Sequence, residues 1–305
     1  MLKTLFFGTS AFALPSLDVI ADRTELHGVV TQADRPAGRG LHLQSSPVKR
    51  AATERALPVY EPASLRAFAS EISSLAFDAF VVASYGKILP RDLLEMPALG
   101  SLNVHPSLLP RYRGATPIQA ALLAGDAEAG VTIMLMDEGM DTGDVVAQER
   151  LTIAADEDFS TLHDRLAELG AKTLGRALER GEREGFFSHR PQTGEASVTR
   201  PISKADLALD WRWPVARIVN HVRAYAPTPA ARAVLGGTLV KVLDVRGLGR
   251  ETASPGTPLG IRDESVAVAC GDGAVAVRAL IAPNHGRESG AAFARRTGLD
   301  SLGPP

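Results

Sequence analysis

An asparagine and a histidine stand two residues apart at a place where their types could support oxyanion or acid–base chemistry. Asn103 and His105 lie where the apolar stretch Leu102–Val104 meets a loop rich in proline and serine. Because alternate residues of a strand point to the same side, both side chains leave one face. Ligands bind at the carboxyl ends of strands in open α/β sheets, so the pair is a candidate site. The alternative is a polar strand end that caps the next helix.

A second segment ends in a similar way and supplies acidic side chains. The apolar stretch Val131–Met136 runs into a loop that contains Gly139 and Gly143. Its four carboxylates belong to Asp137, Glu138, Asp141 and Asp144. A metal site needs ligands around one point, tempered by neutral donors, whereas a solvated turn needs neither. The two glycines favour a tightly folded loop that offers one carboxylate to a neighbour, and we expect no metal.

Both segments need a sheet to position them, and alternating apolar and helical stretches predict one. The run Leu2–Phe7 ends at Gly8 as a buried parallel strand would, and Leu26–Thr31 follows as a second strand. Further strands are predicted at 79–83, 102–104 and 131–136, and helices at 11–22, 116–124 and 160–183. This alternation predicts the α/β class, with a Rossmann-like, open and mostly parallel sheet.

The pattern changes near residue 234, where short apolar runs separated by turn signals predict a second, smaller domain. Runs such as Leu239–Val245, Ser265–Ala269 and Ala274–Ile281 indicate a small β-barrel, led by a helix over 214–224. The stretch Ser188–Ser203 has little apolar content and reads as a linker. We therefore expect a first domain at 1–188, a linker at 189–206 and a β-barrel domain at 207–305.

Composition and length fit a globular protein with two unequal domains. The 305 residues are 45% hydrophobic and 22% charged, and the one cysteine, Cys270, cannot form an intramolecular disulfide. No apolar run approaches the roughly 20 residues of a membrane span, and Met1–Gly8 is too short for a signal peptide. These features predict a cytoplasmic protein. Ser10 replaces the second glycine of a dinucleotide fingerprint, which argues against nicotinamide binding.

Charge is distributed unevenly along the chain. Residues 1–200 hold 20 lysines and arginines against 26 acidic residues, whereas residues 201–305 hold 13 against 9. A basic smaller part beside an acidic larger one favours an anionic partner for the smaller part, although chance composition would also produce this difference.

Taken together, these segments resemble the 10-formyltetrahydrofolate-dependent formyltransferases. The motifs that carry the resemblance are Asn103-Val-His105-Pro-Ser-Leu-Leu-Pro110, Arg113-Gly114 and Met136-Asp-Glu-Gly-Met-Asp141-Thr-Gly. It is greatest to the members that act on methionyl initiator tRNA, and it covers nearly the whole chain. Further shared segments are Phe6–Ser10, Asp34–Gly40, Ser84–Pro90, Gly125–Ile133, Ile202–Lys204 and Gly271–Gly273.

The resemblance implies a reaction in which an amine attacks the formyl carbon and negative charge develops on the formyl oxygen. The Asn103 amide and the His105 imidazolium would donate hydrogen bonds to that oxygen, each worth about 3 kcal/mol. Asp141 would orient His105, favour its charged form and relay a proton from the attacking nitrogen through water.

The resemblance also implies where the co-substrate 10-formyltetrahydrofolate binds. The expected contacts are Ser107, Leu108, Leu109 and Pro110, with Tyr85, Gly86, Ile88 and Leu89 from an earlier segment. A flat pterin ring fits an apolar slot with a few backbone hydrogen bonds, which leucine, isoleucine and proline beside glycine can supply. The alternative is that these are ordinary exits from strand to loop.

Contacts with tRNA are implied for two regions. Gln32–Pro47 is about 15 residues long, near the upper end for a structureless connection, and by resemblance it inserts into the acceptor stem. The smaller basic domain resembles an oligonucleotide-binding (OB-like) barrel. The expected tRNA contacts are Arg35, Arg39, Lys49, Lys204, Arg223 and Lys241. Contacts of this kind position RNA through its phosphates without reading sequence.

Three other activities are compatible with parts of this pattern. A formyltransferase for a small amine, such as an amino-sugar nucleotide, or a hydrolase that passes the formyl group to water would keep Asn103, His105 and Asp141. Neither explains the Arg35–Arg39 loop together with a basic second domain. A catalytically silent RNA-binding protein would not need the three polar residues. The sequence therefore favours a monomeric enzyme that formylates methionyl initiator tRNA.

Overall fold

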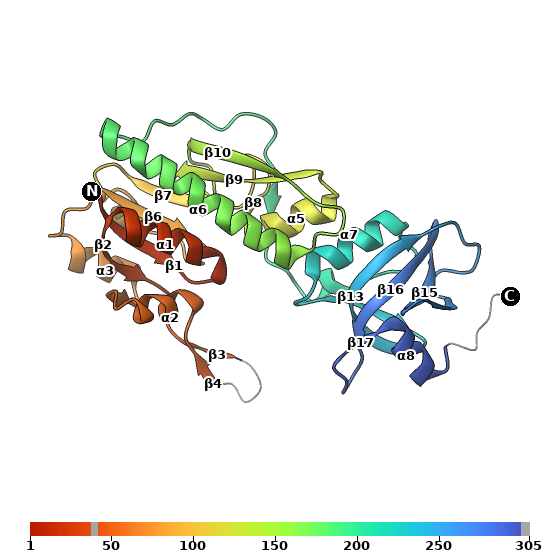
Figure 1. Cartoon of the computed structure of the whole chain (residues 1–305). Helices are drawn as coiled ribbons and strands as arrows, with labels where there is room; N and C mark the ends of the chain where they lie inside the picture. The colour runs from red at the N-terminus through yellow and green to blue at the C-terminus, as the bar shows by residue number, and fades with distance from the viewer. Residues whose placement is uncertain (38–41, 300–305) are drawn as a thin grey trace. The chain divides into compact units, whose positions relative to one another are not determined.

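The computed structural model describes residues 1–37 and 42–299, which form two compact units (Figure 1). The first unit comprises Met1–Pro117, Ala129–Leu151 and His163–Thr199. The second comprises Ile118–Glu128, Thr152–Leu162 and the chain from Arg200 onward. The division at 1–188, 189–206 and 207–305 stays a prediction. In the described residues, no helix combines the length and the apolar character that crossing a bilayer requires.

The first unit is built on a seven-stranded sheet in the order β10-β9-β7-β6-β1-β2-β5. These strands are β1 (Lys3–Gly8), β2 (Glu25–Val30), β5 (Val59–Tyr60), β6 (Ala79–Ala83), β7 (Ser101–His105), β9 (Glu128–Leu135) and β10 (Val145–Thr152). Strands β7, β6, β1, β2 and β5 run parallel, and β9 pairs antiparallel with β7. β6 is buried at every residue, as a central parallel strand covered on both faces must be.

Helices cover the sheet of the first unit. They are α1 (Leu14–Arg23), preceded by the 3-10 turn η1 (Ala11–Ala13), α2 (Pro47–Glu54), α3 (Leu65–Ile72), α4 (Arg91–Leu94) and the long α6 (Phe159–Glu184). The apolar residues of α3 and α4 pack on Phe7, Phe80 and Val82 of one sheet face. Helix α6 lies across the other face (Figure 1). A methyl group added at its Gly170 would be 2.8 Å from Val104 Cγ1. Because Val104 faces α6, its strand neighbours Asn103 and His105 face away from this helix.

The segment predicted as the loop Gln32–Pro47 contains a β-hairpin. Strand β3 (Arg35–Ala37) pairs antiparallel with β4 (His42–Gln44). The hairpin is followed by α2, whose first turn is capped by Ser46, since its Oγ accepts a hydrogen bond of 3.0 Å from the Lys49 N–H. The hairpin gives the segment regular backbone pairing.

The second unit is an antiparallel sheet in the order β12-β13-β16-β15-β14, with β17 paired to β16. Its elements are β12 (Ala231–Leu235), β13 (Thr238–Leu248), β14 (Pro258–Arg262), β15 (Ser265–Cys270), β16 (Gly273–Ile281), β17 (Arg287–Ser289), α5 (Pro117–Ala124), η2 (Ala205–Leu207), α7 (Val215–Tyr225) and α8 (Gly290–Thr297). Ile218 and Val222 of α7 and Phe293 of α8 pack into one apolar core with the strands. The predicted class, a Rossmann-like parallel-rich sheet followed by a smaller β domain, is confirmed.

Candidate active site

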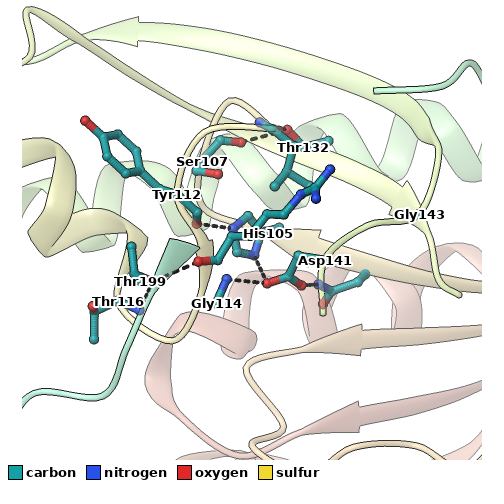
Figure 2. Close-up of polar contacts among 12 residues, drawn as sticks. His105, Ser107, Tyr112, Gly114, Thr116, Thr132, Asp141, Gly143 and Thr199 are labelled. Carbon is teal, nitrogen blue, oxygen red and sulfur yellow. Dashed lines mark hydrogen bonds and ion pairs between the residues drawn. The ribbon is translucent and has the colours of Figure 1, made fainter. Parts of the chain in front are cut away.

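His105 ends strand β7 and is held from two sides. Its side chain is 5% exposed, and Nε2 lies 3.0 Å from the backbone oxygen of Tyr112. Its other ring nitrogen, Nδ1, lies 3.6 Å from Oδ2 of Asp141 (Figure 2). A ring with both nitrogens facing oxygen atoms has one fixed orientation, which is a requirement for directed proton transfer.

Asp141 brings the acidic loop to this histidine. Its Oδ2 accepts a hydrogen bond of 2.7 Å from the backbone N–H of Gly114, and its Oδ1 lies 3.5 Å from Asn103 Nδ2. The structure thus gathers all three residues predicted as catalytic, from β7 and from a loop 36 residues later. Figure 2 shows the Asp141 carboxylate between His105 and Gly114.

Glycine is required at two positions around this carboxylate. Gly114 has a φ of 99°, and a Cβ there would lie 2.3 Å from the backbone oxygen of Thr199. A Cβ at Gly143 would lie 1.8 Å from the backbone oxygen of Leu135. The close approach of backbone to backbone explains why the motif around Asp141 contains glycine.

The protonation of His105 is set by competing effects. Burial lowers the pKa of its imidazole below the ordinary value, while the Asp141 carboxylate and the Tyr112 carbonyl act in the opposite direction. From the sequence, we expected Asp141 to favour the charged ring. In the structure, removal from water outweighs that attraction, so the ring is mainly neutral at neutral pH.

The loop after His105 is fixed by a polar network with β9 and β10. Thr132 Oγ1 donates to the backbone oxygen of Ser107 at 2.7 Å and accepts from the Leu109 N–H at 3.2 Å. Gln148 Nε2 donates to both Leu109 O and Thr132 Oγ1. Ser107 Oγ donates to the backbone oxygen of Arg111 at 2.6 Å. The predicted folate segment 107–110 is therefore rigidly mounted beside His105 (Figure 2).

The predicted folate residues differ in what they expose. Ser107, Leu109 and Pro110 are buried and Leu108 is half-buried, packed so close to Gly130 that a Cβ there would touch its side chain. In the other segment, Tyr85 and Leu89 belong to the core, while Gly86 is exposed and Ile88 is 87% exposed. Burial raises the pKa of the Tyr85 phenol to about 12. The Tyr85 carbonyl already accepts hydrogen bonds from Thr9 Oγ1 and Gln32 Nε2, so Tyr85 serves the core of the first unit.

The predicted tRNA contacts fall into three groups. Arg35, Lys204 and Lys241 are exposed. Lys49 and Arg223 are engaged within the protein: Lys49 Nζ lies 2.9 Å from Asp34 and 2.8 Å from Glu61, and Arg223 donates to the backbone oxygens of Glu157 and Ala154. Arg39 lies outside the described residues.

No group of three histidine, cysteine, aspartate or glutamate side chains that could hold a metal occurs in residues 1–37 and 42–299. In the acidic loop, Asp137 accepts hydrogen bonds from Thr142 and from the Gly139 N–H, whereas Asp144 pairs with His189 at 2.8 Å. Asp137, Asp141 and Asp144 of the predicted tight loop thus each have different partners.

Two contributors to the site were not predicted from the sequence. The first is the Tyr112 carbonyl, which orients His105. The second is Gln192, from the predicted linker, whose Nε2 donates to the backbone oxygens of Asp141 and Gly143, each at 2.8 Å. A backbone carbonyl is common to all residues, so the sequence does not single it out. Gln192 lies 51 positions from Asp141, too far for any pattern of local spacing to connect the two. Neither could have been found without the fold.

Three features define a class of group-transfer protein. They are the parallel-rich sheet, the polar trio of Asn103, His105 and Asp141 at the carboxyl end of β7, and the separate β domain. The chain matches the formyl transferase family over residues 3–178 and the C-terminal domain of formyl transferases over residues 201–298. These matches cover most of the sequence. The chain belongs to the formyl transferase family.

Similar proteins include both sequence relatives and solved structures. The chain is 42% identical to the methionyl-tRNA formyltransferase of Paraburkholderia phymatum over 299 residues, 94% of this chain and 91% of that one. It resembles the Helicobacter canadensis N-formyltransferase in complex with folinic acid and dTDP-3-aminofucose, with a TM-score of 0.67 and 19% identity over 91% of this chain and 99% of that one. HypX from Aquifex aeolicus in complex with tetrahydrofolic acid also has a TM-score of 0.67, with 18% identity. All of this chain is covered in that comparison, but it spans only 48% of HypX. At these identities the two structures support the fold alone.

Proposed function

We propose that the protein transfers a formyl group from 10-formyltetrahydrofolate to the amino group of methionyl initiator tRNA. The observation that carries this proposal is the meeting of Asn103, His105 and Asp141 at the end of β7, within distances of 3.5 and 3.6 Å. The relative that is 42% identical over 94% of this chain is named methionyl-tRNA formyltransferase, which supports the choice of acceptor.

The residues around the trio fit a folate. β6 and β7 are parallel neighbours, so the segments that follow them, 84–90 and 106–114, leave the same edge of the sheet. Ile88 is 87% exposed and Met140, next to Asp141, is 61% exposed. Exposed apolar side chains beside polar groups suit a flat, partly apolar ring. Ser107, Leu108, Leu109, Pro110 and the 85–89 segment would hold it, and 10-formyltetrahydrofolate would supply the formyl group.

The three polar side chains have separate roles in the proposed reaction. The Asn103 amide donates a hydrogen bond to the formyl oxygen as it becomes negative, which contributes about 3 kcal/mol. A ring N–H of His105 donates a second one after it leaves its protein partner, since both ring nitrogens face protein oxygens in this structure. The attacking amine must lose one proton, and the departing folate nitrogen must gain one. Asp141 and the mainly neutral His105 ring can accept the proton of the amine and pass it to the folate nitrogen. A proton can move between the two groups, because His105 Nδ1 and Asp141 Oδ2 lie 3.6 Å apart.

The tRNA is proposed to be held by exposed cations in each unit. Arg35 lies on the β3–β4 hairpin of the first unit, and Arg39 belongs to the same segment. Lys204 and Lys241 are the exposed candidates of the second unit. Lys49 and Arg223 are better assigned to holding the Asp34 region and the 154–157 segment, because their charged groups already have partners. We further propose a cytoplasmic monomer of 32.2 kDa.

The test is transfer of a labelled formyl group from 10-formyltetrahydrofolate to charged initiator tRNA. The wild type should transfer, His105→Ala should lose at least about 100-fold in kcat, and the exposed His285→Ala should be unchanged. If the donor is consumed but the tRNA is not formylated, methionyl initiator tRNA is not the acceptor. Amino sugars and water would then be tested as acceptors. Absence of donor consumption would overturn the proposed chemistry.

A further inference from the structure

The segment Arg190–Thr199, here called the strap, runs along the loops that carry the active-site residues. Arg190 exchanges two backbone hydrogen bonds with Val145. Further along, Ser197 Oγ accepts from the Tyr112 N–H at 2.8 Å, and Thr199 Oγ1 donates to the Arg113 carbonyl at 3.0 Å. Strand β11 (Val198–Thr199) pairs parallel with β8 (Arg113–Gly114). The strap is therefore part of the first unit and is built into its site.

Gln192 lies in the middle of the strap and makes four hydrogen bonds. Its Nε2 donates to the backbone oxygens of Asp141 and Gly143, each at 2.8 Å. Its Oε1 accepts from Arg113 Nε at 3.2 Å and from Nη2 at 2.7 Å. The amide has one orientation only, because its nitrogen faces two carbonyls and its oxygen faces two N–H donors.

These bonds join the two loops that supply both partners of His105. Arg113 follows Tyr112, whose carbonyl meets His105 Nε2, and the other loop contains Asp141, which faces Nδ1. Asp141 has a φ of 53°, in the left-handed region that is unfavourable for a residue other than glycine. A conformation of this kind persists only where its surroundings fix it, and Gln192 binds the carbonyl of that same residue.

We propose that Gln192 is a positioning residue for formyl transfer, holding the Asp141 backbone so that its carboxylate faces His105. Gln192 acts through Asp141, because its two N–H donors bind the carbonyls of Asp141 and Gly143. The inference rests on the proposed function, since its main readout is the rate of formyl transfer.

The test compares two Gln192 variants with a control at His189, the residue just before the strap. Gln192→Ala removes all four bonds, and Gln192→Glu keeps the acceptor for Arg113 but loses both N–H donors. The control, His189→Ala, removes a surface pair with Asp144 and leaves the Asp141 backbone untouched. Steady-state kinetics with both substrates and the thermal unfolding midpoint are measured for each protein.

We expect both Gln192 variants to lose about tenfold or more in kcat, with KM for each substrate within about twofold of wild type, because a small displacement of a catalytic group affects the reaction step. His189→Ala should keep its kcat within about twofold. If Gln192→Ala does not fold, the kinetics of Gln192→Glu alone decide the test.

Three results would overturn the role of Gln192: kcat near wild type in Gln192→Glu, a change confined to KM, or an equal loss in His189→Ala. Should the wild type itself transfer no formyl group, the proposed function fails first, and the hydrogen exchange of the Gly143 amide decides about Gln192. If the Gly143 amide exchanges faster in Gln192→Glu than in His189→Ala, Gln192 holds this loop in place. Equal exchange rates overturn the proposal.

Discussion

The Asp141 carboxylate faces Nδ1 of His105 at 3.6 Å while the same oxygen, Oδ2, accepts a hydrogen bond of 2.7 Å from the Gly114 N–H. The Gly114 N–H holds the carboxylate in place, because it donates to the same oxygen that faces the ring. A proton taken up by this pair can therefore pass between Oδ2 of Asp141 and Nδ1 of His105.

Replacing Asp141 by asparagine should lower kcat by roughly 100-fold or more, since the amide keeps the shape but neither attracts nor relays a proton. Substrate KM values should change little, because Asp141 is assigned to the reaction step. Steady-state formyl transfer measures both. Asp164→Asn, which alters the histidine–aspartate pair at His163, is the matched control and should be silent. An Asp141→Asn enzyme with more than a third of wild-type kcat contradicts the assignment.

Gly114→Ala should damage both stability and activity. The φ of 99° costs a non-glycine residue on the order of 1–3 kcal/mol, and the new methyl would collide with Thr199 O in the strap. We expect a loss of about 2 kcal/mol or more in the free energy of unfolding, measured with urea, and a fall in kcat as the Asp141 contact is displaced. Gly249→Ala meets open space and should leave both quantities unchanged. Equal stability of the two variants would show that the loop simply shifts.

The sequence predicted the elements that depend on local pattern. The apolar run Ala79–Ala83 was predicted with the bounds that strand β6 has, because a fully buried parallel strand is a continuous apolar run between turn residues. The helix predicted over 160–183 extends from Phe159 to Glu184. The pairing of Asn103 with His105 on one face also follows from strand geometry alone.

What the sequence could not predict depends on partners distant in the chain. Lys49 and Arg223 looked like free cations, but their partners include Glu61 and the 154–157 carbonyls, which only the fold brings near. The neutral His105 ring follows from burial, which a residue type does not reveal. The role of the strap was hidden because proline- and glycine-containing segments of low apolar content usually connect domains without entering a site.

Stability should fall as the pH is lowered from about 7.5 to 5.5. Burial lowers the pKa of His105 and of His221, so unfolding lets both side chains bind protons that the folded protein does not. The unfolded state then holds more protons below the ordinary histidine value of about 6.5, and the free energy of unfolding decreases as pH falls through that range.

Urea titrations at several pH values measure this slope. His221→Gln removes one contribution and should flatten it, whereas His285→Gln, at an exposed position, should not. An unchanged slope in His221→Gln would mean that this side chain titrates alike in the folded and unfolded states.

Arg223 should matter for folding rather than for tRNA. Its guanidinium donates to Glu157 O at 2.6 Å and to Ala154 O at 3.2 Å, so Arg223→Gln removes two hydrogen bonds made by a charged donor and should cost about 1–3 kcal/mol of unfolding free energy. The tRNA KM at a temperature where the variant is folded should stay near wild type. Arg287→Gln removes an equal charge from an exposed site and should leave stability unchanged. A raised tRNA KM in Arg223→Gln without loss of stability would restore the original assignment.

Lys204→Glu and Lys241→Glu should weaken tRNA binding with no effect on the reaction step. Both side chains are exposed, and a phosphate contact contributes through release of counterions. Each variant should raise the tRNA KM by about 3- to 10-fold at low salt, leave kcat at saturating tRNA unchanged, and reduce the slope of log affinity against log salt by about 0.7 to 0.9. Lys172→Glu makes the same charge change at an exposed position of α6 and controls for general electrostatic repulsion. If all three variants raise KM equally, the effect comes from net charge. If only the first two do, the effect is local to these lysines, as direct contact with the tRNA phosphates predicts.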